Sequence, residues 1–131
     1  MKKLEWLERE LEFIKTHEMV DDVTERALLY SLQVCIEIAM DVVAMLTKDL
    51  GLTVEDDYSN LEKLHKEDIL DTKEVELLKQ YNGLRNVIVH SYDIINMEIV
   101  KEGLNIIDEV YEIVAKLIEI YEKQSVGLYP D

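Results

Sequence analysis

Apolar residues recur at spacings of three and four along most of this chain, which places them on one face of an α-helix. Leu4, Leu7, Leu11 and Ile14 follow this spacing near the N-terminus. We therefore predict an amphipathic first helix over about residues 2–17.

A longer apolar pattern comes next. Asp21 or Asp22 is suited to cap the start of a second helix, because a short carboxylate accepts a hydrogen bond from a free backbone N–H group. Gly51 marks its end. The apolar positions between these residues are Val23, Ala27, Leu28, Leu32, Cys35, Ala39, Val42, Val43 and Leu46. A helix of this span is on the order of 40 Å long.

The next segment, residues 53–58, is acidic and aperiodic and predicts a connector. Ser59 or Asn60 is suited to cap a short helix that carries Leu61 and Leu64. This helix would link the second and third main helices.

Asp71 and Glu74 have the spacing of a capping box, which predicts the start of the third main helix. A fourth main helix is predicted from Asn96 onward, with residues 124–131 as a flexible tail. The third helix has its apolar face at Val75, Leu77, Leu78, Tyr81, Leu84 and Val87 or Ile88; the fourth has it at Ile99, Val100, Ile106, Ile107, Val110, Val114, Leu117, Ile118 and Tyr121. The pattern predicts an all-α, antiparallel up-down bundle of four main helices and one short connecting helix.

Composition agrees with one small helical domain over residues 1–131. Apolar residues make up 48% of the chain and charged residues 33%, with one proline and four glycines. No uninterrupted apolar run reaches the roughly 18 residues of a membrane span, and the first residues turn acidic at Glu5, so we expect a cytoplasmic protein. The lone Cys35 lies among apolar residues and is expected to be a small buried side chain.

The net charge of −15 opposes non-specific binding to nucleic acid, since such binding depends on lysine and arginine. A basic partner, or a small phosphate-binding site within an acidic protein, is compatible with it. Lys73 and Lys79 could form a basic strip with Arg85, although such lysines are usually solvated.

Residues 85–92 read Arg-Asn-Val-Ile-Val-His-Ser-Tyr and lie at the end of the third main helix. A guanidinium stays charged and donates through a fixed fork that suits phosphate oxygens. Histidine exchanges protons near neutral pH. Arg85 and His90 are therefore candidates for phosphodiester chemistry without a metal.

Helix geometry limits how these residues can meet. Five steps of about 100° place Arg85 and His90 about 140° apart on an ideal helix. Seven steps bring Arg85 and Tyr92 nearly onto one stripe, and four steps align Asn86 with His90. For Arg85 and His90 to converge, the helix must end or bend near Val89, or a second copy must supply the other half. We favour a homodimer in which two motifs face each other.

The pattern Arg85-Asn86-x-x-x-His90-x-Tyr92, at the end of the third main helix of a small bundle, resembles the HEPN superfamily and, more closely, the HepT toxins. The resemblance covers nearly the whole chain, including its length, the Leu-rich first helix and the long second helix. Asn86 and Tyr92 make the pattern more specific than an Arg-x4-His spacing.

This resemblance implies a metal-independent ribonuclease toxin without a cofactor, paired with a minimal nucleotidyltransferase antitoxin of the MntA type. Arg85 and His90 carry over as the catalytic pair, and Asn86 as a polar residue that shapes the site. The ribose 2′-hydroxyl of RNA would attack the adjacent phosphorus, leaving a 2′,3′-cyclic phosphate. Tyr92 carries over as the residue that the antitoxin modifies with AMP, which adds negative charge beside the site.

Other interpretations stay open at this point. His90, next to apolar residues, is also compatible with a hydrogen-bonded core histidine. A non-catalytic dimeric module that binds or regulates a nucleotidyltransferase, or binds a nucleotide, would use the same Arg85, His90 and Tyr92 surface. The acidic charge favours that module, and the intact catalytic pair favours the ribonuclease.

Three further acidic residues, Glu37, Asp41 and Glu62, are candidates for a role at a site. Glu37 and Asp41 lie one turn apart on the second helix and either orient Arg85 or His90 or form an exposed acidic pair. Glu62-x-x-His65 is half of a carboxylate-bundle metal motif, and the chain has no second Glu-x-x-His. We therefore expect no metal site there.

Overall fold

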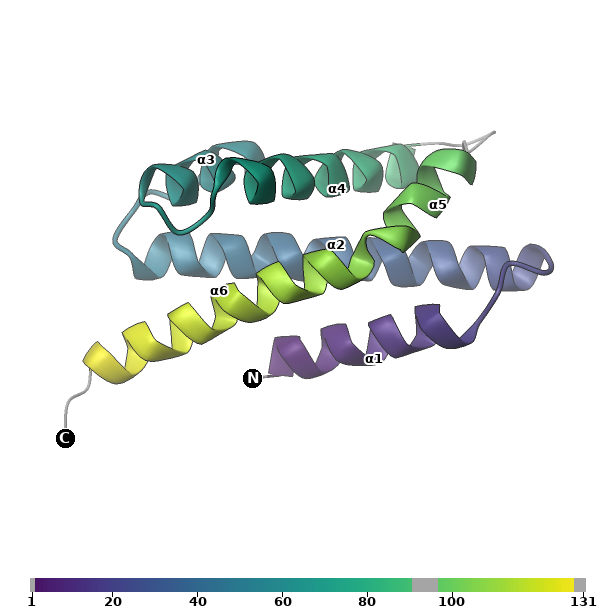
Figure 1. Ribbon diagram of the computed structural model, residues 1–131, viewed down its shortest axis with the longest axis horizontal. Coiled ribbons are helices and arrows are strands. Elements are labelled where there is room, and N and C mark those ends of the chain that lie inside the picture. The colour runs from purple at the N-terminus through teal and green to yellow at the C-terminus, as the bar shows by residue number, and fades with distance from the viewer. Residues whose placement is uncertain (1, 91–96, 129–131) are drawn as a thin grey trace.

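The computed structural model describes residues 2–90 and 97–128, except for the side chains of residues 90, 97 and 125–128. The described residues form an all-helical bundle, as the apolar spacing predicted (Figure 1). Its helices are α1 (Lys2–Thr16), α2 (Asp22–Asp49), α3 (Asp57–Lys66), α4 (Thr72–His90), α5 (Met97–Asn105) and α6 (Ile107–Leu128).

Helix α2 is the centre of the bundle and packs against each of the other five helices. In Figure 1, α1 runs along one side of α2, α3 and α4 run along the other, and α6 crosses it. The start of α2 is capped as expected, because Asp21 Oδ1 accepts a hydrogen bond of 2.8 Å from the Thr24 backbone N–H. The chain leaves the helix at Gly51, whose φ of 79° suits a residue without a side chain.

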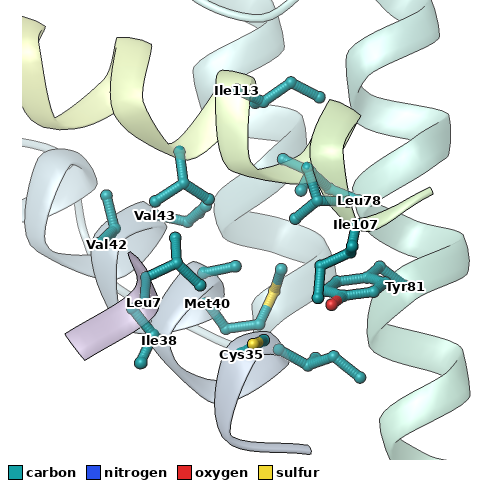
Figure 2. Close-up of a cluster of buried hydrophobic side chains, with 14 of the residues drawn as sticks. Leu7, Cys35, Ile38, Met40, Val42, Val43, Leu78, Tyr81, Ile107 and Ile113 are labelled. Atoms are coloured by element: carbon teal, nitrogen blue, oxygen red, sulfur yellow. The ribbon is translucent and has the colours of Figure 1, made fainter. Parts of the chain in front are cut away.

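Burial explains the apolar composition of α2. By length and composition this helix could cross a membrane, since its most apolar window has a mean hydropathy of 1.7. However, 67% of that window is buried inside the bundle, as in a core helix. Figure 2 shows Cys35, Ile38, Met40 and Val43 of α2 within the buried cluster that also contains Tyr81 of α4.

The cap of α3 differs from our prediction. Helix α3 begins at Asp57, and Asp56 is its N-cap, accepting a hydrogen bond of 2.8 Å from the Ser59 backbone N–H. Asn60, one of the two predicted caps, is instead buried, and its side chain bonds both backbone groups of Glu55. Its amide fixes the preceding loop, a role that a local pattern does not reveal.

The predicted final helix is wrong in one respect, because it is two helices that separate at Ile106. Helix α5 leans towards α4, whereas α6 continues across α2 (Figure 1). Gly103 lets α5 come close to α4, since a Cβ atom there would lie 2.1 Å from Leu84 Cδ2. Helix α6 also continues to Leu128, where we expected the tail to have begun.

Candidate active site

The face of α4 that turns inward determines where the motif side chains project. The helix starts with the predicted capping box: Asp71 Oδ1 accepts a 2.7 Å bond from the Glu74 backbone N–H, and Glu74 Oε1 accepts a 3.0 Å bond from the Asp71 N–H. Tyr81 and Leu84 are buried, and Ile88 packs against the core. Arg85 lies next to this buried face, and its side chain therefore reaches the neighbouring helix α2.

Arg85 lies beside Glu37 of α2. The Arg85 Nε atom is 3.5 Å from Glu37 Oε1, and the two side chains are 33% and 43% exposed. The guanidinium is thus partly covered on its Nε side and reaches the surface, as a group that binds phosphate must. The sequence left two roles open for Glu37, orienting Arg85 or His90 and forming an exposed acidic pair with Asp41. In the structure, Glu37 lies where it can orient Arg85.

Asp41 lies one turn further along α2 and does not face Arg85. Its Oδ2 atom is 3.4 Å from the Lys3 Nζ of α1, and the Asp41 side chain is 63% exposed. The structure therefore separates the two acidic residues: Glu37 turns towards α4, and Asp41 turns towards α1.

The last turn of α4 is exposed. Asn86 lies at the surface, and Val87 and Val89 are 38% and 39% exposed. His90 is the last residue of α4, but its side chain lies outside the described part, and Tyr92 lies outside the described residues altogether. Helix α4 ends at His90, one residue after Val89, so the helix does end near Val89, as one of the alternatives from the sequence required.

Other candidate residues have ordinary structural roles. Cys35 is fully buried, as predicted, and burial raises the pKa of its thiol to about 12, with the nearby Glu10 charge acting in the same direction. His65 Nδ1 donates to the Leu70 carbonyl at 2.9 Å. Lys79 forms an ion pair with Glu62 of α3, which occupies its ammonium group and lowers the pKa of the Glu62 carboxyl. In the described part of the chain, no group of three or more His, Cys, Asp or Glu residues could hold a metal ion.

Sequence reasoning missed Gln33. Its Nε2 atom donates to Glu37 Oε1 at 3.2 Å, the same oxygen that faces Arg85. The only local signal was the four-residue spacing between Gln33 and Glu37, which makes them neighbours on one helix face.

Comparison with known proteins gives consistent results. The family model described as Ribonuclease HepT-like matches residues 2–120. A protein of Archaeoglobus fulgidus named "Putative RNase" is 48% identical over 123 residues, which cover 94% of this chain and 93% of the relative. A protein of Methanocaldococcus jannaschii that is also named "Putative RNase" is 61% identical over 74 residues, covering 56% of this chain and 85% of the relative.

Solved structures share the fold. One is a tri-AMPylated Shewanella oneidensis HEPN toxin in complex with an MNT antitoxin, with a TM-score of 0.74. It is 19% identical, and the match covers 93% of this chain and 95% of that chain. A toxin–antitoxin structure with AMP-PNP has the same TM-score at 18% identity, covering 92% of this chain and 95% of that one. These matches identify the helical arrangement as that of HEPN toxins.

Proposed function

Because this chain belongs to the HepT-like ribonuclease family, we propose that it is a toxin that cleaves RNA without a metal ion, using Arg85 and His90. The observation that carries this proposal is the position of Arg85: its Nε side faces Glu37 and its side chain reaches the surface at the exposed end of α4. A guanidinium held at one edge is directed to bind a phosphate group with its other edge.

The reaction that fits these groups is an internal transfer at phosphorus. His90, as general base, removes the proton of the ribose 2′-hydroxyl, whose oxygen then forms a bond to the adjacent phosphorus. Arg85 stabilises the charge that develops on the phosphate oxygens. The bond to the 5′-oxygen breaks, that oxygen takes up a proton from the protonated His90 or from water, and a 2′,3′-cyclic phosphate remains. Asn86, exposed one residue after Arg85, contributes a polar group at the same end of α4.

We further propose that the active form is a homodimer. Arg85 and His90 are five residues apart, and ideal helix geometry predicts an angle of about 140° between positions at this spacing. A second copy facing this end would bring one Arg85 near the other His90. The exposed Val87 and Val89 supply apolar surface for such a contact. Light scattering at micromolar concentration tests this, and a monomer would contradict it.

The proposed regulator is a minimal nucleotidyltransferase antitoxin that transfers AMP to Tyr92. The support is the solved structure of the Shewanella toxin, which is AMPylated and in complex with its antitoxin. AMP on Tyr92 would add negative charge to the 85–92 motif and oppose RNA binding. Co-expression with the antitoxin should increase the mass of the chain by AMP units, and Tyr92→Phe should prevent this, whereas Tyr30→Phe, which changes an exposed tyrosine on α2, should not.

The ribonuclease proposal is tested by incubating the purified chain with total RNA and tRNA in EDTA and assaying for cyclic-phosphate ends. We expect cleavage by the parent and a loss of about 100-fold or more in His90→Ala, the range for removing a general acid or base. Arg85→Lys should also lose activity, because an ammonium group lacks the second edge of the guanidinium. His17→Ala, an exposed histidine on the α1–α2 connection, is the matched control and should cleave normally.

The alternative is a non-catalytic dimeric module that binds a nucleotidyltransferase or a nucleotide through the same surface. The net charge of −15 favours it, since this charge opposes RNA approach. No cleavage by protein that is folded and unmodified at Tyr92 would support this module and contradict the ribonuclease.

A further inference from the structure

We infer that Gln33 is a positioning residue for Arg85 and acts through Glu37, an inference that rests on the proposed function of Arg85. Two donors meet at one oxygen atom. Gln33 Nε2 lies 3.2 Å from Glu37 Oε1, and Arg85 Nε lies 3.5 Å from the same Oε1. Gln33 and Glu37 belong to α2 and Arg85 to α4, so the arrangement links the central helix to the motif. We call these three side chains the clamp.

The effect of the clamp is on orientation rather than on stability. An ion pair at 3.5 Å between side chains that are 33% and 43% exposed contributes little to folding, since water and salt screen it. A glutamate held by one contact keeps most of its rotamers, whereas a second donor on the same oxygen restricts them. Gln33 therefore limits where Glu37 can hold the Arg85 Nε atom, and with it where the outer edge of the guanidinium points.

The amide of Gln33 suits this role because it is neutral. It donates a hydrogen bond and leaves the full negative charge of Glu37 for Arg85. A lysine at position 33 would compete with Arg85 for that charge. A glutamate there would repel Glu37 and draw Arg85 towards itself.

The neighbouring carboxylate provides a contrast within the same helix. Asp41 is one turn after Glu37 but pairs with Lys3 of α1 at 3.4 Å. Removing the Asp41 charge changes the net charge by the same amount as removing that of Glu37 without touching the clamp. Asp41→Asn is therefore the matched control for Glu37→Gln, and Gln80→Leu, an exposed glutamine on α4, is the control for Gln33→Leu.

The first test follows the Arg85 Nε–H group directly by ¹⁵N NMR. The chain has only three arginines, so Arg85→Lys identifies the signal. In Gln33→Leu we expect the Arg85 Nε–H to exchange with water about fivefold faster, the factor for losing one neutral hydrogen bond. In Glu37→Gln the Arg85 Nε–H should exchange with water faster still. The Arg26 signal is an internal reference, since Arg26 Nε pairs with Asp22 at 3.2 Å near the start of α2 and does not belong to the clamp.

The second test measures RNA cleavage. Gln33→Leu should lower kcat about fivefold with KM and melting temperature unchanged, while Gln80→Leu and Asp41→Asn behave as the parent. Gln33→Asn, whose amide is one methylene too short to reach Glu37, should show the same loss and covers the case in which Gln33→Leu does not fold. Unchanged Arg85 exchange in both Gln33 variants would overturn the inference. Faster exchange in a chain whose parent does not cleave RNA would support the clamp and contradict the ribonuclease proposal instead.

Discussion

At the scale of single residues, burial decides which reactive groups are available. Cys35 carries a nucleophilic atom, yet its side chain is fully buried beside Tyr81, and burial raises the pKa of both groups. A thiol that stays protonated and out of contact with water cannot act as a nucleophile. Arg85, in contrast, lies near the C-terminal end of α4 and keeps its side chain partly exposed.

The raised pKa of Cys35 predicts how stability depends on pH. The unfolded thiol ionises near 9.0 and the folded one only at about 12, so the unfolded state loses its proton first as the pH rises. The contribution of Cys35 to the free energy of unfolding should therefore be constant below pH 8 and fall above pH 9 by up to about 1.4 kcal/mol per pH unit.

Urea unfolding at pH 8, 9 and 10 measures this fall. Cys35→Ala removes the thiol and should remove most of the slope over this range, although it also costs stability at every pH. An equal slope in both proteins would show that Cys35 is not its source.

At the scale of elements, close packing between α4 and α5 explains why the C-terminal third of the chain is not one helix. Helix α5 packs mainly against α4, whereas α6 packs mainly against α2 and also contacts α1 and α4. One straight helix cannot follow both directions, and the chain changes direction at Ile106. Gly103 permits the close approach to Leu84, because it has no side chain to hold the helices apart.

We expect Gly103→Ala to destabilise the protein by about 1–3 kcal/mol, the usual cost of overpacking, despite the higher helix propensity of alanine. The new Cβ atom would lie 2.1 Å from Leu84 Cδ2, so α5 or Leu84 must move. Thermal and urea unfolding measure the loss.

Gly83→Ala is the matched control on α4. Its Cβ atom would meet only Tyr58 Oη at 3.8 Å, an ordinary contact, so this change should be neutral or stabilise by up to about 1 kcal/mol. Combining Gly103→Ala with Leu84→Ala should cost less than the sum of the single changes, because the clash is removed. If the stability costs of the two changes simply add, a clash with Leu84 is not the reason why Gly103→Ala destabilises the protein.

At the scale of the whole molecule, the net charge of −15 is the dominant electrostatic property. Carboxylates repel one another across a small bundle, and this repulsion favours the unfolded chain. The described ion pairs relieve only some of it, since most lie at the surface, as Lys15–Asp108 does. If the chain cleaves RNA as proposed, Arg85 would have to attract a phosphate group against this negative charge.

Salt should therefore stabilise this protein. Raising NaCl from about 50 mM to about 0.5 M shortens the screening distance and weakens repulsion between surface charges, so the melting temperature should rise by a few degrees. Replacing the exposed Glu5 and Glu12 by glutamine should raise the melting temperature at low salt and reduce the response to salt. A melting temperature that falls with salt would mean that the ion pairs outweigh the repulsion.

Local patterns in the sequence were sufficient to predict most helices. The boundaries of α1 and α2, the Asp21 cap and the Asp71–Glu74 capping box all depend on residues three or four apart, so short-range contacts determine them. The same reasoning found the 85–90 motif at the end of α4. It failed for the cap of α3 and for the division between α5 and α6, where contacts with other parts of the chain decide.

The sequence by itself therefore determined the all-helical class, the apolar faces and the motif that identifies the family, because periodicity and residue order carry that information. Only the tertiary structure decided that Glu37 faces Arg85, that Asp41 pairs with Lys3 instead, and that Gln33 joins the clamp. Arg85 and Glu37 are 48 residues apart in the chain, and their meeting depends on how α4 is rotated against α2. That rotation is set by burying Tyr81 and Leu84 in the common core, which no local pattern specifies.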